Sequence, residues 1–153
     1  MFKELIEKKR YSFHEGFTDW REAVRAACQP LLADGTIEPE YPEAIIGKVE
    51  ELGPYIVIAP DICIPHAQEG VGVNDTAVCF MKTEQPVSFS DDGEHDARLF
   101  FVLASTDNAR HLANLSEMAD LLSEEEFVDK LLACHEPADL EKLELPESET
   151  CSG

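Results

Sequence analysis

Basic residues are scarce in this sequence. Its 153 residues include 12 Lys and Arg against 32 Asp and Glu, which gives a formal net charge of −20 at pH 7. Proteins that bind nucleic acid or anionic lipid need Lys and Arg to displace counterions from phosphate groups. The shortage argues against both kinds of partner and leaves two readings of the acidity. The acidic side chains either form solvated helix faces that keep the protein soluble, or they attract protein partners with a basic surface.

Long apolar runs are also lacking. The longest, residues 55–60 and 99–104, are far shorter than the roughly 20 residues that span a bilayer, and the first residues do not resemble a secretory signal. The five cysteines are scattered without a CxxC pair, which is typical of reduced thiols. These features predict a cytoplasmic protein, and the length suits one domain with its own hydrophobic core.

The motifs of several enzyme classes are missing. The sequence has no GxxxxGK[ST] or GxGxxG loop for a nucleotide, and neither Ser105 nor Ser123 lies in the GxSxG frame of a serine hydrolase. Cys63 and His66 have metal-ligand spacing, but no second pair accompanies them. We therefore expect neither a metal nor another cofactor.

Apolar periodicity predicts helices before, between and after β-rich segments, which is typical of a three-layer α/β domain with a mixed β-sheet flanked by helices. Residues 55–59 are predicted to form a strand that is buried on both faces and ends at Pro60. Residues 61–72 are predicted to form a loop rather than a helix. The predicted elements, in chain order, are helices from 19 to 35 and from 39 to 52, strands over 55–59, 76–81, 86–89 and 98–104, and helices starting near 108, 123 and 137.

Local signals refine three of these helices. Asp19 with Glu22, and Ser123 with Glu126, match capping boxes that start a helix. The helix after Asn108 is expected to bury a stripe at 112, 115, 119 and 122, with Met118 beside it.

His66 follows Pro65 in the predicted loop after the first buried strand. Proline fixes one of its own backbone dihedral angles and favours an extended residue before it, so the imidazole is displayed on a stiffened segment, as suits a nucleophile. The ordinary alternative is a loop histidine satisfied by backbone hydrogen bonds. The pattern alone does not decide between the two.

His111 falls in the first turn of the helix that follows the strand over 98–104. Helix N-termini attract anions and favour a neutral imidazole, so a phosphate-sized group could lie there. The alternative is a partly exposed helix histidine without such a role. If the strands before His66 and His111 are parallel neighbours, both histidines lie at the carboxyl edge of the sheet, where α/β proteins bind ligands.

Four ordered segments resemble a known family. They are Gly-Pro-Tyr-Ile-Val-Ile-Ala-Pro over 53–60, Ile-Pro-His-Ala over 64–67, Asp-Asn-Ala-Arg-His-Leu over 107–112 and Leu-Leu-Ser-Glu-Glu over 121–125. Together they resemble the IIA component (EIIA type 2) of the phosphoenolpyruvate-dependent sugar phosphotransferase system, of the mannitol/fructose type, over about residues 10–143. The segments at 18–22, 37–41 and 51–55 look most like its ascorbate-specific branch.

The resemblance implies a phosphoryl carrier that uses no metal or nucleotide. The phosphocarrier protein HPr would phosphorylate the histidine that corresponds to His66, and the group would pass to a IIB component of a permease. His111 corresponds to the second histidine of the family site, which helps to hold the phosphoryl group. The implied domain spans residues 1–146, and residues 147–153, with nothing to bury, form a disordered tail.

One position departs from the mannitol-type pattern. An Arg in the second helix supports the site there, whereas Lys48 occupies that register here and lacks the planar guanidinium fork. Two other functions stay open from the sequence: a regulatory IIA that binds a target protein, and a non-catalytic acidic binding module. The sugar and the oligomeric state are not set by these residues.

Overall fold

The central element is one five-stranded mixed sheet with the strand order β1-β4-β5-β3-β2. The computed structural model describes residues 2–59, 61–67, 72–89 and 96–143, with backbone alone for 2–4, 108, 110 and 111. β1 pairs with β4 and β3 with β5 in parallel, whereas β4 with β5 and β2 with β3 are antiparallel. The strands are β1 (Tyr11–His14), β2 (Val57–Ala59), β3 (Asp61–Cys63), β4 (Ala77–Ser88) and β5 (Asp96–Ala104).

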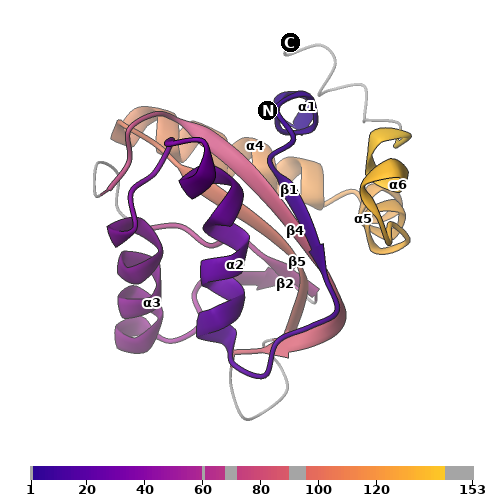
Figure 1. Ribbon diagram of the computed structural model, residues 1–153, viewed down its shortest axis with the longest axis horizontal. Helices are drawn as coiled ribbons and strands as arrows, with labels where there is room; N and C mark the ends of the chain where they lie inside the picture. The colour runs from indigo at the N-terminus through magenta and orange to yellow at the C-terminus, as the bar shows by residue number, and fades with distance from the viewer. Residues whose placement is uncertain (1, 60, 68–71, 90–95, 144–153) are drawn as a thin grey trace.

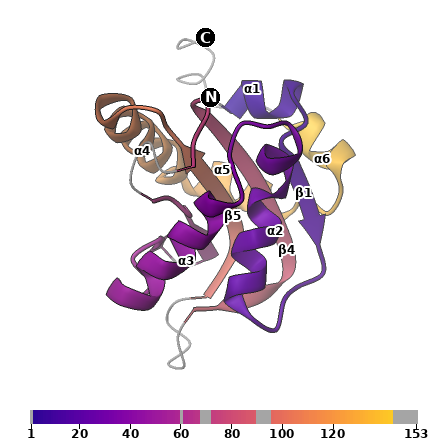
Figure 2. The same ribbon diagram turned by 60° about the vertical axis from the view of Figure 1, so that its left-hand side comes forward.

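Helices cover both faces of this sheet, which confirms the predicted three-layer arrangement (Figures 1 and 2). Alternate residues of β5 point to opposite faces: Phe100 and Val102 pack with α2 and α3, whereas Phe101 and Leu103 pack with the remaining helices. Both faces of the central strands are therefore buried. The helices are α1 (Phe2–Glu7), α2 (Trp20–Ala33), α3 (Glu40–Leu52), α4 (Asn108–Leu122), α5 (Glu125–Leu132) and α6 (Pro137–Glu141).

α2 begins at its predicted cap, and α2 and α3 end close to the predicted positions 35 and 52. The Asp19 side chain accepts a hydrogen bond from the backbone N–H of Arg21 at 3.0 Å and caps α2. Gly35 and Gly53 follow α2 and α3 with φ of 81° and 87°, a left-handed conformation that glycine adopts without steric cost.

The prediction of a strand over 55–59, buried on both faces and followed by a loop over 61–72, is right only in part. β2 is a three-residue edge strand in which Ile58 is 46% exposed, and the chain reverses before Asp61 to form β3 beside β5. Asp61 has a φ of 68°, and Arg98 donates two hydrogen bonds of 3.1 Å to its carboxylate. The antiparallel pairing of β2 with β3 has no local sequence signal besides Pro60, which lies outside the described residues.

The prediction for the buried stripe of α4 is right for Met118, Leu122 and the half-buried Leu115 and wrong for the other two positions. Leu112 is 59% exposed and Ala119 is exposed, whereas Met118, Leu121 and Leu122 are buried. The face of α4 that packs on β5 and α5 is therefore turned about the helix axis relative to the predicted face, which leaves Leu112 outside the core.

The capping box predicted at Ser123 does not form. The Ser123 hydroxyl donates to the carbonyl of Asp120 at 2.6 Å, at the end of α4. Glu124 precedes α5 and makes no side-chain capping bond. A serine at the junction of two helices can serve either one, and here the carbonyls of the preceding helix compete for its hydroxyl.

Two elements at the start of the chain were not predicted, namely α1 and β1. The loop into β1 is held by the buried Arg10, whose guanidinium donates to Asp34 at 2.9 Å and to Thr36 at 3.2 Å. These contacts span more than 20 residues of sequence, so no local pattern reveals them.

β4 is one twelve-residue strand where two short ones were predicted. Its middle contains polar residues, yet Lys82 and Thr83 are buried there, and Lys82 pairs with Glu84. The predicted turn over 91–93, His95 and the tail beyond 146 lie outside the described residues.

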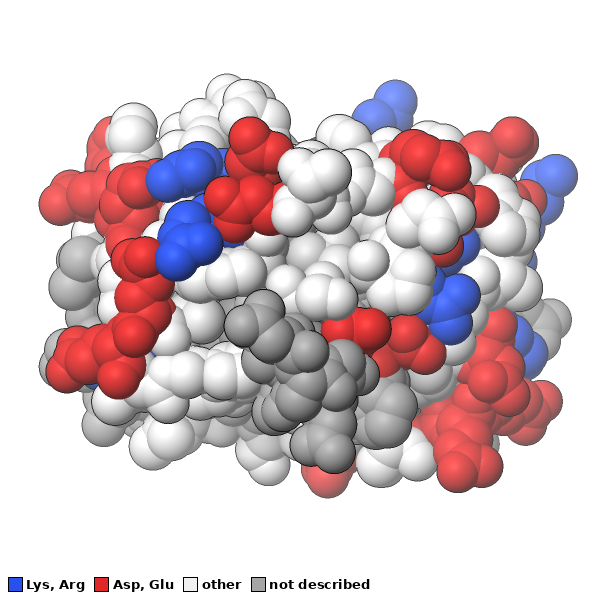
Figure 3. All heavy atoms as spheres, turned by 90° about the horizontal axis from the view of Figure 1, so that it is seen from below, with Lys and Arg blue, Asp and Glu red and all other residues white. Residues whose placement is uncertain are grey.

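On the face shown in Figure 3, acidic side chains lie along both flanks, with basic side chains scattered among them. None of the helices in the described ranges is long and apolar enough to cross a membrane.

Leu131 provides a test of the packing behind β5. It is fully buried on α5, so Leu131→Ala should lower the free energy of unfolding by about 2–5 kcal/mol through lost contacts and a cavity. The matched control is Leu112→Ala, the same change at an exposed helix position, which should cost about 0.5 kcal/mol or less. Urea denaturation measures both, and equal losses would contradict this packing.

Candidate functional site

The segment that follows β3, residues 64–67, has at least one backbone hydrogen bond at each of its four residues. The N–H of Ile64 donates to Ile56 at 2.8 Å, and the N–H of Leu103 in β5 donates to the carbonyl of Pro65 at 3.1 Å. The next carbonyl, that of His66, accepts a hydrogen bond from the Tyr55 hydroxyl. The loop is therefore a rigid continuation of the sheet edge.

Tyr41 completes this restraint from α3. Its fully buried hydroxyl donates to the carbonyl of Leu103 and accepts the N–H of Ala67 at 3.2 Å. Burial raises the pKa of Tyr41 well above its ordinary value, so the hydroxyl stays protonated and serves as donor and acceptor together. One phenol thus ties the end of β5 to the residue after His66.

The imidazole of His66 is half-buried and oriented by its own loop. Its Nδ1 lies 2.6 Å from the carbonyl oxygen of Ile64, two residues earlier. Because a carbonyl only accepts hydrogen bonds, Nδ1 carries the proton, and in the neutral ring Nε2 holds the lone pair. The geometry thus fixes one tautomer and leaves Nε2 as the basic, nucleophilic nitrogen.

Tyr55 lies against the same imidazole. The two ring centroids are 5.2 Å apart with an interplanar angle of 84°, an edge-to-face contact. Sequence reasoning did not single out Tyr55 or Tyr41 as site residues. The spacing of Tyr41 with Ile45 and Val49 places all three on the buried face of α3, and a buried tyrosine needs a hydrogen-bond partner, which is the signal that could have found it.

The second predicted site residue, His111, lies in the first turn of α4. This helix begins four residues after β5 ends, and β5 runs parallel to β3. The loop of His66 and the start of α4 therefore follow neighbouring parallel strands, although the strand before His66 is β3 rather than the predicted 55–59. The side chain of His111 is outside the described part, so its distance from His66 stays a prediction.

The other two candidates differ in burial. Cys63 is fully buried, and burial raises the pKa of its thiol well above the ordinary value, which disfavours the thiolate that a metal would need. Lys48 is half-buried on α3 and, within the described ranges, makes no ion pair.

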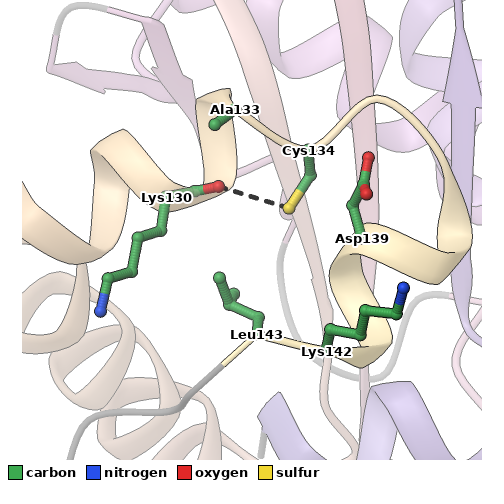
Figure 4. A pocket seen from close by; sticks show the side chains of 6 residues that line it. All are labelled: Lys130, Ala133, Cys134, Asp139, Lys142 and Leu143. Atoms are coloured by element: carbon green, nitrogen blue, oxygen red, sulfur yellow. Dashed lines mark hydrogen bonds between the residues drawn. The ribbon is translucent and has the colours of Figure 1, made fainter.

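A cavity of about 490 Å³ lies elsewhere, between α5 and α6 (Figure 4). None of its lining residues comes from the loop of His66 or from α4. Lys130 and Lys142 carry positive charge there, and Asp139 carries negative charge. The lining residues are Lys130, Ala133, Cys134, Asp139, Lys142 and Leu143.

Known proteins share both the sequence pattern and the fold. Residues 4–143 match the family model described as the phosphoenolpyruvate-dependent sugar phosphotransferase system, EIIA 2. The ascorbate-specific PTS system EIIA component of Escherichia coli K12 is 31% identical over 131 residues, which cover 85% of each chain.

Two solved structures from Escherichia coli share the architecture. The mannitol-specific cryptic phosphotransferase enzyme IIA CmtB superposes with a TM-score of 0.81 at 27% identity, covering 91% of this chain and 94% of its own. Mannitol enzyme IIA, in complex with phosphorylated enzyme IIB, has a TM-score of 0.73 at 22% identity, covering 86% and 91%, and shows the fold alone.

The fold is a mixed sheet between helix layers, and the loop of His66 follows β3, an inner strand that is parallel to β5. This architecture is that of a IIA-type domain of the mannitol class. The chain belongs to the EIIA type 2 family of the phosphoenolpyruvate-dependent sugar phosphotransferase system, whose members are phosphotransferase components.

The double hydrogen bond of Tyr41 can be tested by Tyr41→Phe. The change leaves the Leu103 carbonyl and the Ala67 N–H unpaired in the interior, so stability should fall by about 1–3 kcal/mol and the Ala67 amide should exchange faster with solvent. Tyr11→Phe is the matched control, because the Tyr11 hydroxyl donates to Glu141 at the surface and the loss of this bond should cost about 0.5 kcal/mol or less. An unchanged Ala67 exchange rate would contradict this role.

Proposed function

We propose that His66 is the phosphoryl acceptor of this phosphotransferase component. The hydrogen bond of 2.6 Å between Nδ1 and Ile64 carries the proposal, because it directs the lone pair to Nε2. The restrained backbone of residues 64–67 adds to this, since phosphoryl transfer depends mainly on positioning and on electrostatic stabilisation.

The reaction balances on this ring. The Nε2 lone pair attacks the phosphorus of phospho-HPr, a new N–P bond forms, and the bond from phosphorus to HPr breaks with its electron pair returning to HPr. Nδ1 keeps its proton throughout, and the Ile64 carbonyl stabilises the positive charge that develops on the imidazole. The reverse chemistry passes the group to a IIB component.

His111 is the second residue of the proposed site. Its place in the first turn of α4 is where a helix has unpaired N–H groups and a partial positive charge. We expect the imidazole and this helix end to offset the charge of the phosphoryl group bound to His66.

We assign the chain to the cytoplasm, as the IIA component that serves an ascorbate permease. The curated relative with 31% identity is named for ascorbate, and a complex of a mannitol enzyme IIA with phosphorylated IIB gives the pattern for the partner. The sugar itself would be bound by the membrane component, so the choice of IIB partner tests the assignment to ascorbate. A regulatory IIA or a simple binding module would appear as a protein that passes no phosphoryl group to any IIB.

His66→Ala should abolish labelling by phosphoenolpyruvate, enzyme I and HPr, because the nucleophile is lost. His14→Ala is the control, since His14 is exposed on β1 and outside the site, and it should label at the wild-type rate. Mass spectrometry that preserves acid-labile phosphohistidine locates the group. A phosphoryl group found on another residue of the wild type would refute the assignment.

His111→Ala should fold and still accept the phosphoryl group, but transfer should slow by about 10²–10³-fold, by analogy with the removal of one donor from an oxyanion hole. Single-turnover transfer from purified phospho-HPr, followed by transfer to IIB, measures both steps. Wild-type rates in both steps would leave His111 with no part in the chemistry.

A further inference from the structure

Tyr55 contacts the proposed acceptor in two ways. Its hydroxyl donates a hydrogen bond to the main-chain carbonyl of His66, and its ring meets the imidazole edge-on with centroids 5.2 Å apart. The first contact holds the backbone of the histidine and the second restricts its side chain.

Tyr55 is itself fixed by the end of α3. Gly53 ends that helix with a left-handed φ of 87°, and its carbonyl accepts the N–H of Tyr55 at 2.7 Å. The next turn closes where the N–H of Val57 donates to Pro54 at 3.2 Å. The phenol is therefore carried by a tight turn between two regular elements rather than by a long loop.

The hydroxyl of Tyr55 stays protonated near neutral pH and so remains a donor. Burial raises the pKa of Tyr55 to about 12, with a smaller contribution from Cys63, so the phenol does not ionise near neutral pH. The contact with the His66 carbonyl thus does not switch with pH in the neutral range.

The restraint bears on the direction of the reacting lone pair. The bond from Nδ1 to Ile64 spans only two residues, so it depends on the backbone at His66 as well as on the ring orientation. If the carbonyl of His66 were released, the peptide plane could rotate and the bond to Ile64 would weaken. The Nε2 lone pair would then sample more directions, and in-line attack would become less frequent.

We propose that Tyr55 is a positioning residue for phosphoryl transfer, which holds the carbonyl and the ring of His66 so that Nε2 keeps one tautomer and one direction. The proposal rests on the assignment of His66 as the acceptor. Tyr55 donates no proton to the phosphoryl group and forms no covalent bond. Its effect applies equally to acceptance and to donation, because the same Nε2–P bond forms in one step and breaks in the other.

The test compares Tyr55→Phe, which keeps the ring and removes only the hydroxyl, with the control Tyr11→Phe. In single-turnover reactions with purified phospho-HPr, Tyr55→Phe should slow both phosphorylation and the return of the group to HPr by about tenfold, with an unchanged equilibrium between the two proteins. Tyr11→Phe should react at the wild-type rate. Circular dichroism and thermal melting establish that each variant is folded.

A second measurement separates positioning from simple stability. Nitrogen-15 spectra of the His66 ring in the wild type should show one dominant tautomer with the proton on Nδ1, and Tyr55→Phe should shift the signals toward a mixture. A mixed population in the wild type, or a variant with wild-type rate and spectra, would overturn the role of Tyr55. A variant that melts earlier but transfers at the wild-type rate per folded molecule would overturn it too.

The outcomes also distinguish this proposal from the assignment of the acceptor. If the wild type carries the phosphoryl group on another residue, both proposals fail. If the wild type is labelled on His66 and Tyr55→Phe behaves as Tyr11→Phe does, only the role of Tyr55 fails. Tyr55→Leu removes the ring as well, so its loss of rate should exceed that of Tyr55→Phe, and an equal loss would limit the role to the hydroxyl.

Discussion

The parallel pairing of β3 with β5 is the constraint on which the candidate site depends. It brings the loop after β3 beside the end of β5, where the N–H of Leu103 reaches the carbonyl of Pro65. It also places the start of α4, which follows β5, at the same edge of the sheet. Without this pairing, the loop of His66 and the start of α4 would not follow neighbouring parallel strands, although the elements that carry them would be unchanged.

Two tyrosines extend this constraint from the sheet to α3. Tyr41 lies in the first turn of the helix and Tyr55 just beyond its end, and both hydroxyls reach the main chain of residues 66–67 or of β5. The main-chain groups of a tight loop near a sheet edge cannot all pair with other strands, so side chains must satisfy some of them. Here the phenols do so and add rigidity, because each is anchored in a regular element or a short turn.

Sequence reasoning found the regular parts of this arrangement and missed the long-range ones. The strand over 98–104, the cap at Asp19 and the helix ends near 35 and 52 were predicted from local signals, and the structure agrees with them. β3 was missed because the reversal at Asp61 depends on a left-handed residue and on Arg98, 37 positions away. The site histidines were proposed from a stiffened loop and a helix start. The partners that orient His66 depend on packing, which residue spacing does not show.

The two edge strands of the sheet affect the tendency of the protein to aggregate in a crowded solution. Its outermost strands are only three and four residues long, β2 and β1, and the pairing of β2 is further broken by a register shift. A long regular edge would offer a row of unpaired N–H and C=O groups to a strand from another molecule. These short edges offer few such groups, so the apolar central strands are shielded from sheet-to-sheet aggregation by the geometry of the strands that flank them.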